Sequence, residues 1–174
     1  MEKLPHECGV ALVCLPGNDA DAVPGALAML RDQRHRGRQG AGLAVPDAAG
    51  GFSVLKFDGD NSLDHLCDAA CALHGDMVLG HVRYATSGQR TRANAQPMVL
   101  HHCKGAMAIC HNGNLTNAPQ LRHKLEMNGS IFHGTSDTEV IGYLLTQNRL
   151  ISPDIETAVC RTMEQIVGAT AWSL

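Results

Sequence analysis

The chain has 174 residues and a net charge of −3, and 44% of its residues are hydrophobic while 18% are charged. This composition predicts a folded domain of ordinary size and argues against a disordered chain or a basic nucleic-acid-binding protein. No apolar run approaches the roughly 20 residues that span a bilayer, and the polar segment 1–7 lacks the apolar core of a signal peptide.

The seven cysteines are an odd number in a chain that is too long to need a disulfide framework. They fit reduced thiols better than a secreted scaffold. We therefore expect a cytoplasmic protein without a membrane or nucleic-acid partner.

Predicted strands are short apolar runs bounded by turn residues, and predicted helices have apolar residues three or four positions apart. Because strands and helices come in groups, we predict an α+β fold built in layers. In chain order we expect a strand over 9–15, a helix from Pro24 that ends before Gly37, strands over 41–45 and 52–57, a helix over 63–73, a strand over 77–84, a hairpin of 98–102 with 106–110, a helix between Asn117 and Asn128, a helix after Ser136, a helix over 153–166 and a strand from 169.

Two helix starts carry capping patterns. Asn117 with Gln120, and Ser136 with Glu139, match the capping box, in which two side chains bond each other's backbone amides. The second pattern places Asp137 in the first turn of a helix, where an acid interacts favourably with the helix dipole. An alternative role for Asp137 is to bind the ammonium group of a substrate.

Cys8 stands at the entrance to the first predicted strand. A buried cysteine is most often a small apolar core residue. The alternative is a nucleophile whose base is its own α-amino group, freed by removal of residues 1–7 as a propeptide. That amine has an unperturbed pKa of roughly 7.7–8.0, which suits proton transfer near neutral pH.

Three further segments have a structural and a functional interpretation. His35–Gly42 (HRGRQGAG) follows a helix and precedes a strand, the wrong order for a dinucleotide loop, and its arginines fit a solvated helix end better than a nucleic-acid patch. Arg83, at the end of a strand, is either a surface cation or a carboxylate clamp. Asn112–Gly113 is first a turn signal, and it can also form an oxyanion hole from a side-chain amide and a backbone N–H.

Zinc-ligand residue types gather around the predicted hairpin. They lack standard ligand spacing and alternate between the two faces of their strands, so we predict no metal site. These residues are His101, His102, Cys103, Cys110 and His111.

Taken together and in order, these segments resemble the class II glutamine amidotransferases, which use an N-terminal nucleophile. The motifs are Cys8-Gly9, HRGRQGAG, GHVRYATSG over Gly80–Gly88, NAQP over Asn94–Pro97, HNGNLTN from His111 and SDTEV from Ser136. Tyr84 and Gln96 favour the amidophosphoribosyltransferase branch, because sugar-phosphate aminotransferases typically have tryptophan and histidine there.

The resemblance implies a four-layer αββα N-terminal-nucleophile hydrolase sandwich and assigns roles to individual residues. Cys8 would attack the carboxamide of L-glutamine and form a thioester, while Asn112 and Gly113 hold the oxyanion. Arg83 would bind the α-carboxylate and Asp137 the α-amino group. Tyr84, Thr86 and Ser87 would line the pocket, and Arg36 and Gly37 would lie near the nucleophile.

The resemblance also implies partners. The family's domain continues past the strand that begins GATAWSL, and a phosphoribosyltransferase domain follows it, so we expect a sandwich that is incomplete at its C-terminus and an acceptor domain supplied elsewhere. We expect no cofactor in this chain, although the family's acceptor domain uses Mg²⁺ and some relatives carry an iron–sulfur cluster. A homo-oligomer remains open. The alternatives are an inactive fragment or binding module, and the glutaminase domain of a sugar-phosphate aminotransferase.

Overall fold

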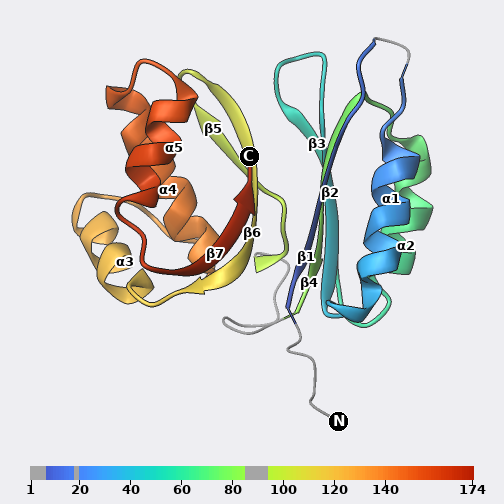
Figure 1. Cartoon of the computed structure of the whole chain (residues 1–174), viewed down its shortest axis with the longest axis horizontal. Coiled ribbons are helices and arrows are strands. Elements are labelled where there is room, and N and C mark those ends of the chain that lie inside the picture. Colours follow the sequence, from blue (N-terminus) through green and yellow to red (C-terminus); the bar gives the residue numbers. More distant parts are fainter. Residues whose placement is uncertain (1–6, 18–19, 85–93) are drawn as a thin grey trace.

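The computed structural model describes residues 7–17, 20–84 and 94–174. Two antiparallel sheets face each other in the middle of the molecule, and helices cover the outer face of each (Figure 1). This arrangement of helix, sheet, sheet and helix layers confirms the predicted α+β sandwich. Within the described part of the chain, no helix is long and apolar enough to cross a bilayer.

The first half of the chain forms one sheet and the helices that cover it. The strand order is β1-β4-β2-β3, with every neighbouring pair antiparallel. The strands are β1 (Gly9–Cys14), β2 (Gly40–Pro46), β3 (Phe52–Asp58) and β4 (Met77–Arg83). The helices are α1 (Val23–Asp32) and α2 (Ser62–Ala69). A short 3₁₀ turn follows each helix, Gln33–His35 after α1 and Ala70–Ala72 after α2.

The second half forms the opposing sheet, in the order β5-β6-β7, with three helices outside it. The predicted hairpin is confirmed, because β5 pairs with β6 from Met98 opposite Ile109 to His102 opposite Gly105. The strands are β5 (Met98–His102), β6 (Gly105–Leu115) and β7 (Gly168–Ser173), and the helices are α3 (Ala118–Met127), α4 (Asp137–Ile151) and α5 (Ile155–Met163).

Strand β2 shows how the layers are held together. Its side chains alternate between two faces, and both faces are buried. Leu43 and Val45 pack in the core beneath α1 and α2, whereas Ala44 faces the other sheet. The core between the sheets joins Ala44 and Leu79 from one sheet to Ala108 and Cys110 from the other.

Asn112–Gly113 is not a turn, contrary to its local signal. Both residues lie inside β6, where Asn112 pairs with Ala171 and Gly113 with Thr170 of β7. Gly113 has a φ of 150°, which side chains rarely allow. A partner strand more than fifty residues along the chain therefore overrides the local turn preference.

The capping predictions are partly wrong. The side chain of Asn117 does not cap α3 but bonds the carbonyl of Gln165 and the N–H of Val167, which ties the loop before β7 in place. Ser136 does cap α4, with its Oγ accepting from the N–H of Thr138 at 3.1 Å.

Glu139 departs from the capping box in another way. Its carboxylate accepts from the N–H groups of His133 and Gly134 at 2.8 and 2.9 Å instead of from the Ser136 amide. It therefore holds the loop that leads into α4.

Candidate functional site

Cys8 lies where β1 begins, beside the end of β4. The two strands are antiparallel, with Gly9 opposite Val82, so the start of one lies beside the end of the other. The Cys8 thiol donates to the carbonyl oxygen of Tyr84, and its sulfur accepts from the Tyr84 N–H, both at 3.4 Å. The backbone of Tyr84 thus orients the sulfur.

The surroundings of Cys8 affect its acidity in two directions. Burial raises the pKa of the thiol above its usual value, while hydrogen bonding to Tyr84 and the charges of Arg83 and Arg36 act to lower it. Because burial prevails, little thiolate exists at neutral pH without a base. A nucleophilic Cys8 therefore requires a proton acceptor nearby.

Arg36 contacts the chain on both sides of the Glu7–Cys8 bond. Its Nε donates to the carbonyl oxygen of Cys8 at 3.2 Å, and its Nη2 lies 3.0 Å from the Glu7 carboxylate. Gly37, the next residue, lies against the backbone at the end of β4, where a methyl group would stand 2.6 Å from the carbonyl carbon of Arg83. Arg36 therefore contacts Cys8 directly, whereas Gly37 contacts the backbone of Arg83.

The opposing sheet brings two more candidate groups. Asn112 and Gly113 are near the end of β6, and Asp137 is the first residue of α4. The N–H of Leu115, at the last position of β6, donates to Asp137 Oδ2 at 2.8 Å. This bond ties the start of the helix to the strand.

Two hollows meet at Cys8. One is lined by Cys8 together with Arg83, Tyr84, Gly113 and Asp137. The other, of about 350 Å³, is lined by Cys8 together with Arg36 and Asn112. The structure therefore brings most of the candidate residues around one sulfur atom, with contributions from both sheets, while the candidates Thr86 and Ser87 lie outside the described residues.

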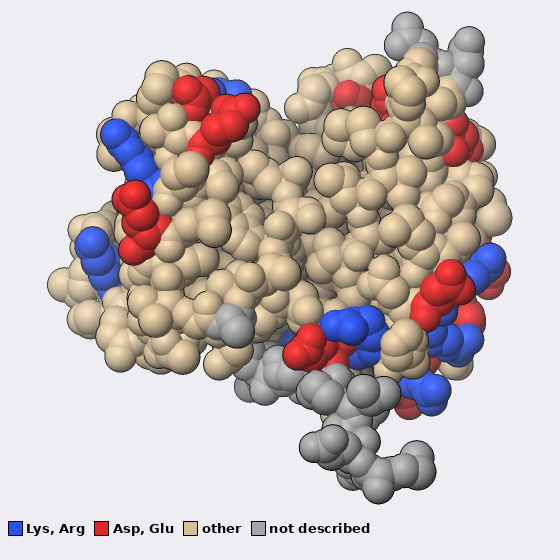
Figure 2. Space-filling model, viewed as in Figure 1, with Lys and Arg blue, Asp and Glu red and all other residues tan. Residues whose placement is uncertain are grey.

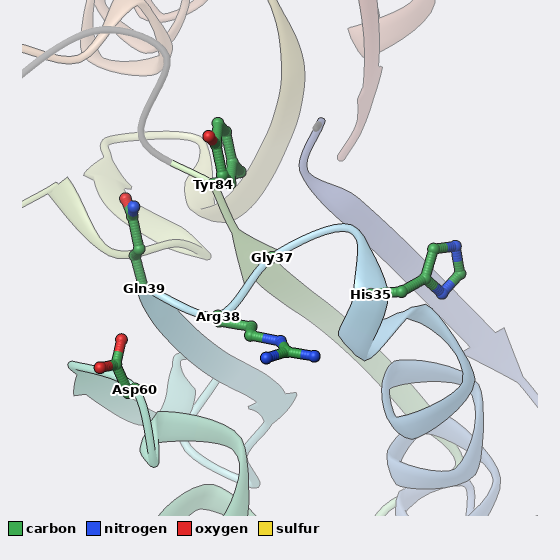
Figure 3. A pocket seen from close by; sticks show the side chains of 6 residues that line it. All are labelled: His35, Gly37, Arg38, Gln39, Asp60 and Tyr84. Carbon is green, nitrogen blue, oxygen red and sulfur yellow. The ribbon is translucent and has the colours of Figure 1, made fainter. Parts of the chain in front are cut away.

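A larger cavity of about 520 Å³ adjoins this site (Figure 3). Tyr84 and Gly37 line it, and so do Arg38 and Gln39, which directly precede β2, and Asp60, in the loop before α2. Cys8 is not among its described lining residues, so this cavity lies beside the two hollows at Cys8 and is separate from them.

Sequence reasoning missed four residues around the sulfur. Gln96 and His111 are buried and line the hollow that contains Cys8 and Arg83. Both lie in the quoted motifs NAQP and HNGNL, but neither was given a role in the site. The remaining two are Ser136 and Thr138, on either side of Asp137.

The alternative interpretations have outcomes as well. Within residues 7–17, 20–84 and 94–174, no three His, Cys, Asp or Glu side chains lie close enough to hold a metal ion. Arg34, which directly precedes the segment His35–Gly42, pairs with Asp64 at 3.0 Å. Acidic and basic side chains are mixed on the face seen in Figure 2, as in an ordinary solvated surface.

The chain matches known proteins over nearly its whole length. Residues 66–148 match the family model described as a glutamine amidotransferase domain. Over 98% of the chain it is 37% identical to the amidophosphoribosyltransferase of Staphylococcus aureus strain MRSA252. Over 93% of the chain it is 37% identical to the amidophosphoribosyltransferase of Archaeoglobus fulgidus.

Solved structures give the same answer. The glutamine phosphoribosylpyrophosphate amidotransferase of B. subtilis, solved with ADP and GMP, superposes on 95% of the chain with a TM-score of 0.79 and 29% identity. The chain spans 34% of that structure and 34% of the length of the Staphylococcus aureus relative. The chain is therefore similar over nearly its whole length to amidophosphoribosyltransferases, and its residues 66–148 match a glutamine amidotransferase domain.

Proposed function

We propose that this chain is the glutamine-hydrolysing half of an amidophosphoribosyltransferase, which releases ammonia from L-glutamine for transfer to 5-phosphoribosyl diphosphate in purine biosynthesis. The observation that carries the proposal is the hollow shared by Cys8, Arg83, Gly113 and Asp137. It combines a nucleophile, a cation, a backbone N–H and an anion, which are the groups needed to hold an amino acid by its charged end and attack its side chain.

The amino-acid end of glutamine would lie between Arg83 and Asp137. The planar guanidinium of Arg83 matches the α-carboxylate, and the Asp137 carboxylate matches the α-ammonium. The hollow is small, at about 20 Å³, and in this proposal its side chains move apart as glutamine enters.

The first chemical step would be attack by Cys8. Removal of residues 1–7 frees the α-amino group of Cys8, which takes the thiol proton as sulfur bonds to the carboxamide carbon. Asn112 and the Gly113 N–H hold the resulting oxyanion, and loss of one such donor typically costs about 10²- to 10³-fold in rate. The carbon–nitrogen bond then breaks, and the amine passes its proton to the departing ammonia.

The second step would regenerate the thiol. Water attacks the γ-glutamyl thioester while the Cys8 amine accepts its proton, and the carbon–sulfur bond breaks as the amine returns that proton to sulfur and glutamate leaves. These steps use only groups of this chain, and we propose no cofactor for them. The ammonia acceptor would belong to a phosphoribosyltransferase domain or subunit.

The proposed chemistry is tested by mass and by labelling. We expect the purified active chain to begin at Cys8, to hydrolyse glutamine and to be labelled once by a glutamine-mimicking diazoketone. Cys8→Ala should abolish both hydrolysis and labelling, while Cys14→Ala, which removes an exposed thiol at the end of β1, should preserve them.

Two outcomes would contradict the proposal. Labelling that persists in Cys8→Ala would reveal another nucleophile, and a folded chain that retains residues 1–7 without hydrolysing glutamine would favour a binding module. The acceptor is tested separately by the reading frame that follows Leu174, where a sugar-phosphate domain would indicate the aminotransferase alternative.

A further inference from the structure

Gln96 bonds both backbone groups of one residue in β6. Its Nε2 donates to the carbonyl oxygen of His111 at 3.1 Å, and its Oε1 accepts from the His111 N–H. Gln96 and His111 are 6% and 3% exposed, so water does not compete for these bonds. The pair extends the β5–β6 ladder, because Met98 lies opposite Ile109 and the same register places Gln96 opposite His111.

His111 directly precedes Asn112 and Gly113, the residues assigned to the oxyanion. A side-chain amide that holds both backbone groups of His111 limits movement of the strand immediately before that pair. Gln96 also lines the hollow that contains Cys8 and Gly113. The bond therefore acts at the end of β6 where chemistry is proposed.

Asn94, two residues earlier, makes a matching contact with a different element. Its Oδ1 accepts from the N–H of Thr135 at 3.0 Å, and its Nδ2 donates to Thr135 Oγ1 at 3.1 Å. Asn94 is 2% exposed. A methyl group on Gly134 would stand 2.4 Å from Asn94 Oδ1, so the approach depends on glycine there.

Thr135 leads into Ser136 and Asp137, the start of α4. One buried segment, Asn94–Gln96, therefore holds the strand that carries the proposed oxyanion donors and the helix that carries the proposed ammonium ligand. The Leu115 N–H bond to Asp137 joins the same strand and helix directly.

We propose that Asn94 and Gln96 are positioning residues that set the distance between the oxyanion donors Asn112 and Gly113 and the ammonium ligand Asp137. This role rests on the proposed glutaminase function. Oxyanion donors act mainly in the transition state, so misplacing them lowers kcat, whereas misplacing an ammonium ligand weakens substrate binding and raises KM.

The test uses the full chain with Gln96→Met and Asn94→Ala. We expect Gln96→Met to lower kcat about 10- to 100-fold with a smaller change in KM, because small misplacements of reacting groups have large effects. We expect Asn94→Ala to act chiefly on KM. The matched control is Gln165→Met, which removes an amide that bonds Asn148 and Arg161, outside the site, and should leave both constants unchanged.

Amide hydrogen exchange supplies a readout that needs no activity. Gln96→Met should speed exchange at the amides of Asn112 and Gly113 more than at those of Ser136 and Asp137. Asn94→Ala should do the reverse. Gln96→Glu, which keeps the shape and the acceptor but loses the donor, should give the same pattern more weakly and serves if Gln96→Met does not fold.

Unchanged exchange at these amides in the folded variants would overturn the positioning role, whether or not the wild type hydrolyses glutamine. Wild-type kinetics in Gln96→Met beside an active wild type would overturn it too. An inactive wild type whose variants show the expected exchange pattern would instead contradict the glutaminase function and leave the two contacts established as a structural link.

Discussion

The Asp137 carboxylate accepts the N–H of Leu115 at 2.8 Å, so the acid assigned to the substrate also joins α4 to β6. Asp137→Asn separates the two roles, because an amide oxygen can still accept that N–H but carries no charge. We expect a stability loss of no more than about 1 kcal/mol, from the weaker interaction with the helix dipole, and a KM for glutamine raised about 10- to 100-fold, since a charged hydrogen bond is lost.

A glutamine analogue that lacks the α-amino group supplies the control for Asp137→Asn. Its binding should change little in the variant. If glutamine and the analogue lose the same binding affinity in the variant, Asp137 does not bind the ammonium group and serves only to join α4 to β6.

Arg83→Lys should raise the KM for glutamine about tenfold, because a planar two-pronged donor becomes a single point charge. Steady-state kinetics measure the effect. Arg38→Lys changes an exposed arginine beside the neighbouring cavity and should leave KM unchanged. A KM unaffected by Arg83→Lys would remove Arg83 from the carboxylate role.

Gly37→Ala should destabilise the fold by about 1–3 kcal/mol, because the new methyl group would meet the backbone of Arg83 at 2.6–2.8 Å. Urea unfolding measures the loss. Gly25→Ala is the matched control, since its methyl group in α1 would lie 4.0 Å from the nearest neighbour, Val13, and alanine should stabilise the helix by about 0.5–1 kcal/mol. Equal stability of the two variants would contradict the predicted clash.

His81 should make the fold sensitive to acid. Burial between the sheets lowers its pKa to about 3, assisted by the charges of Arg83, His111 and Lys56 and opposed by the backbone of His111. The unfolded chain therefore takes up this proton from about pH 6.5 downward while the folded chain does not. Stability is full above that pH and falls by about 2 kcal/mol between pH 7 and 5.

Urea unfolding at pH 8, 7, 6 and 5 tests this acid sensitivity. His81→Met should make the free energy of unfolding depend less on pH. Part of the pH dependence should remain, because burial also lowers the pKa of His111. Parallel curves for the wild type and His81→Met would exclude His81 as the source.

The sequence predicted helices and strands well where they depend on residues close together in the chain. Apolar runs predicted β1 to β4 and the β5–β6 hairpin, and Ser136 marked the start of α4. The misses are non-local. Asn112–Gly113 pairs with a distant strand, and Asn117 bonds a distant loop, so no short window of sequence contains their partners.

The site divides in the same way. The family resemblance predicted one site for Cys8, Arg83 and Asp137, and these three residues line one hollow, while their chemical roles stay proposals. The sequence did not predict a role for Gln96 in the site. Its side chain bonds the backbone of His111, fifteen residues along the chain, and only the folded structure shows that contact.

The packed layer between the sheets has a consequence for the design of variants. Arg83 lies in one sheet and Asn112 in the other, and Ala44 and Ala108 belong to the core cluster between them. We expect a bulkier residue at Ala44 or Ala108 to shift the two sheets relative to each other, because overpacking a core displaces the backbone. Such a substitution would change the spacing of the candidate site residues although it lies outside the site.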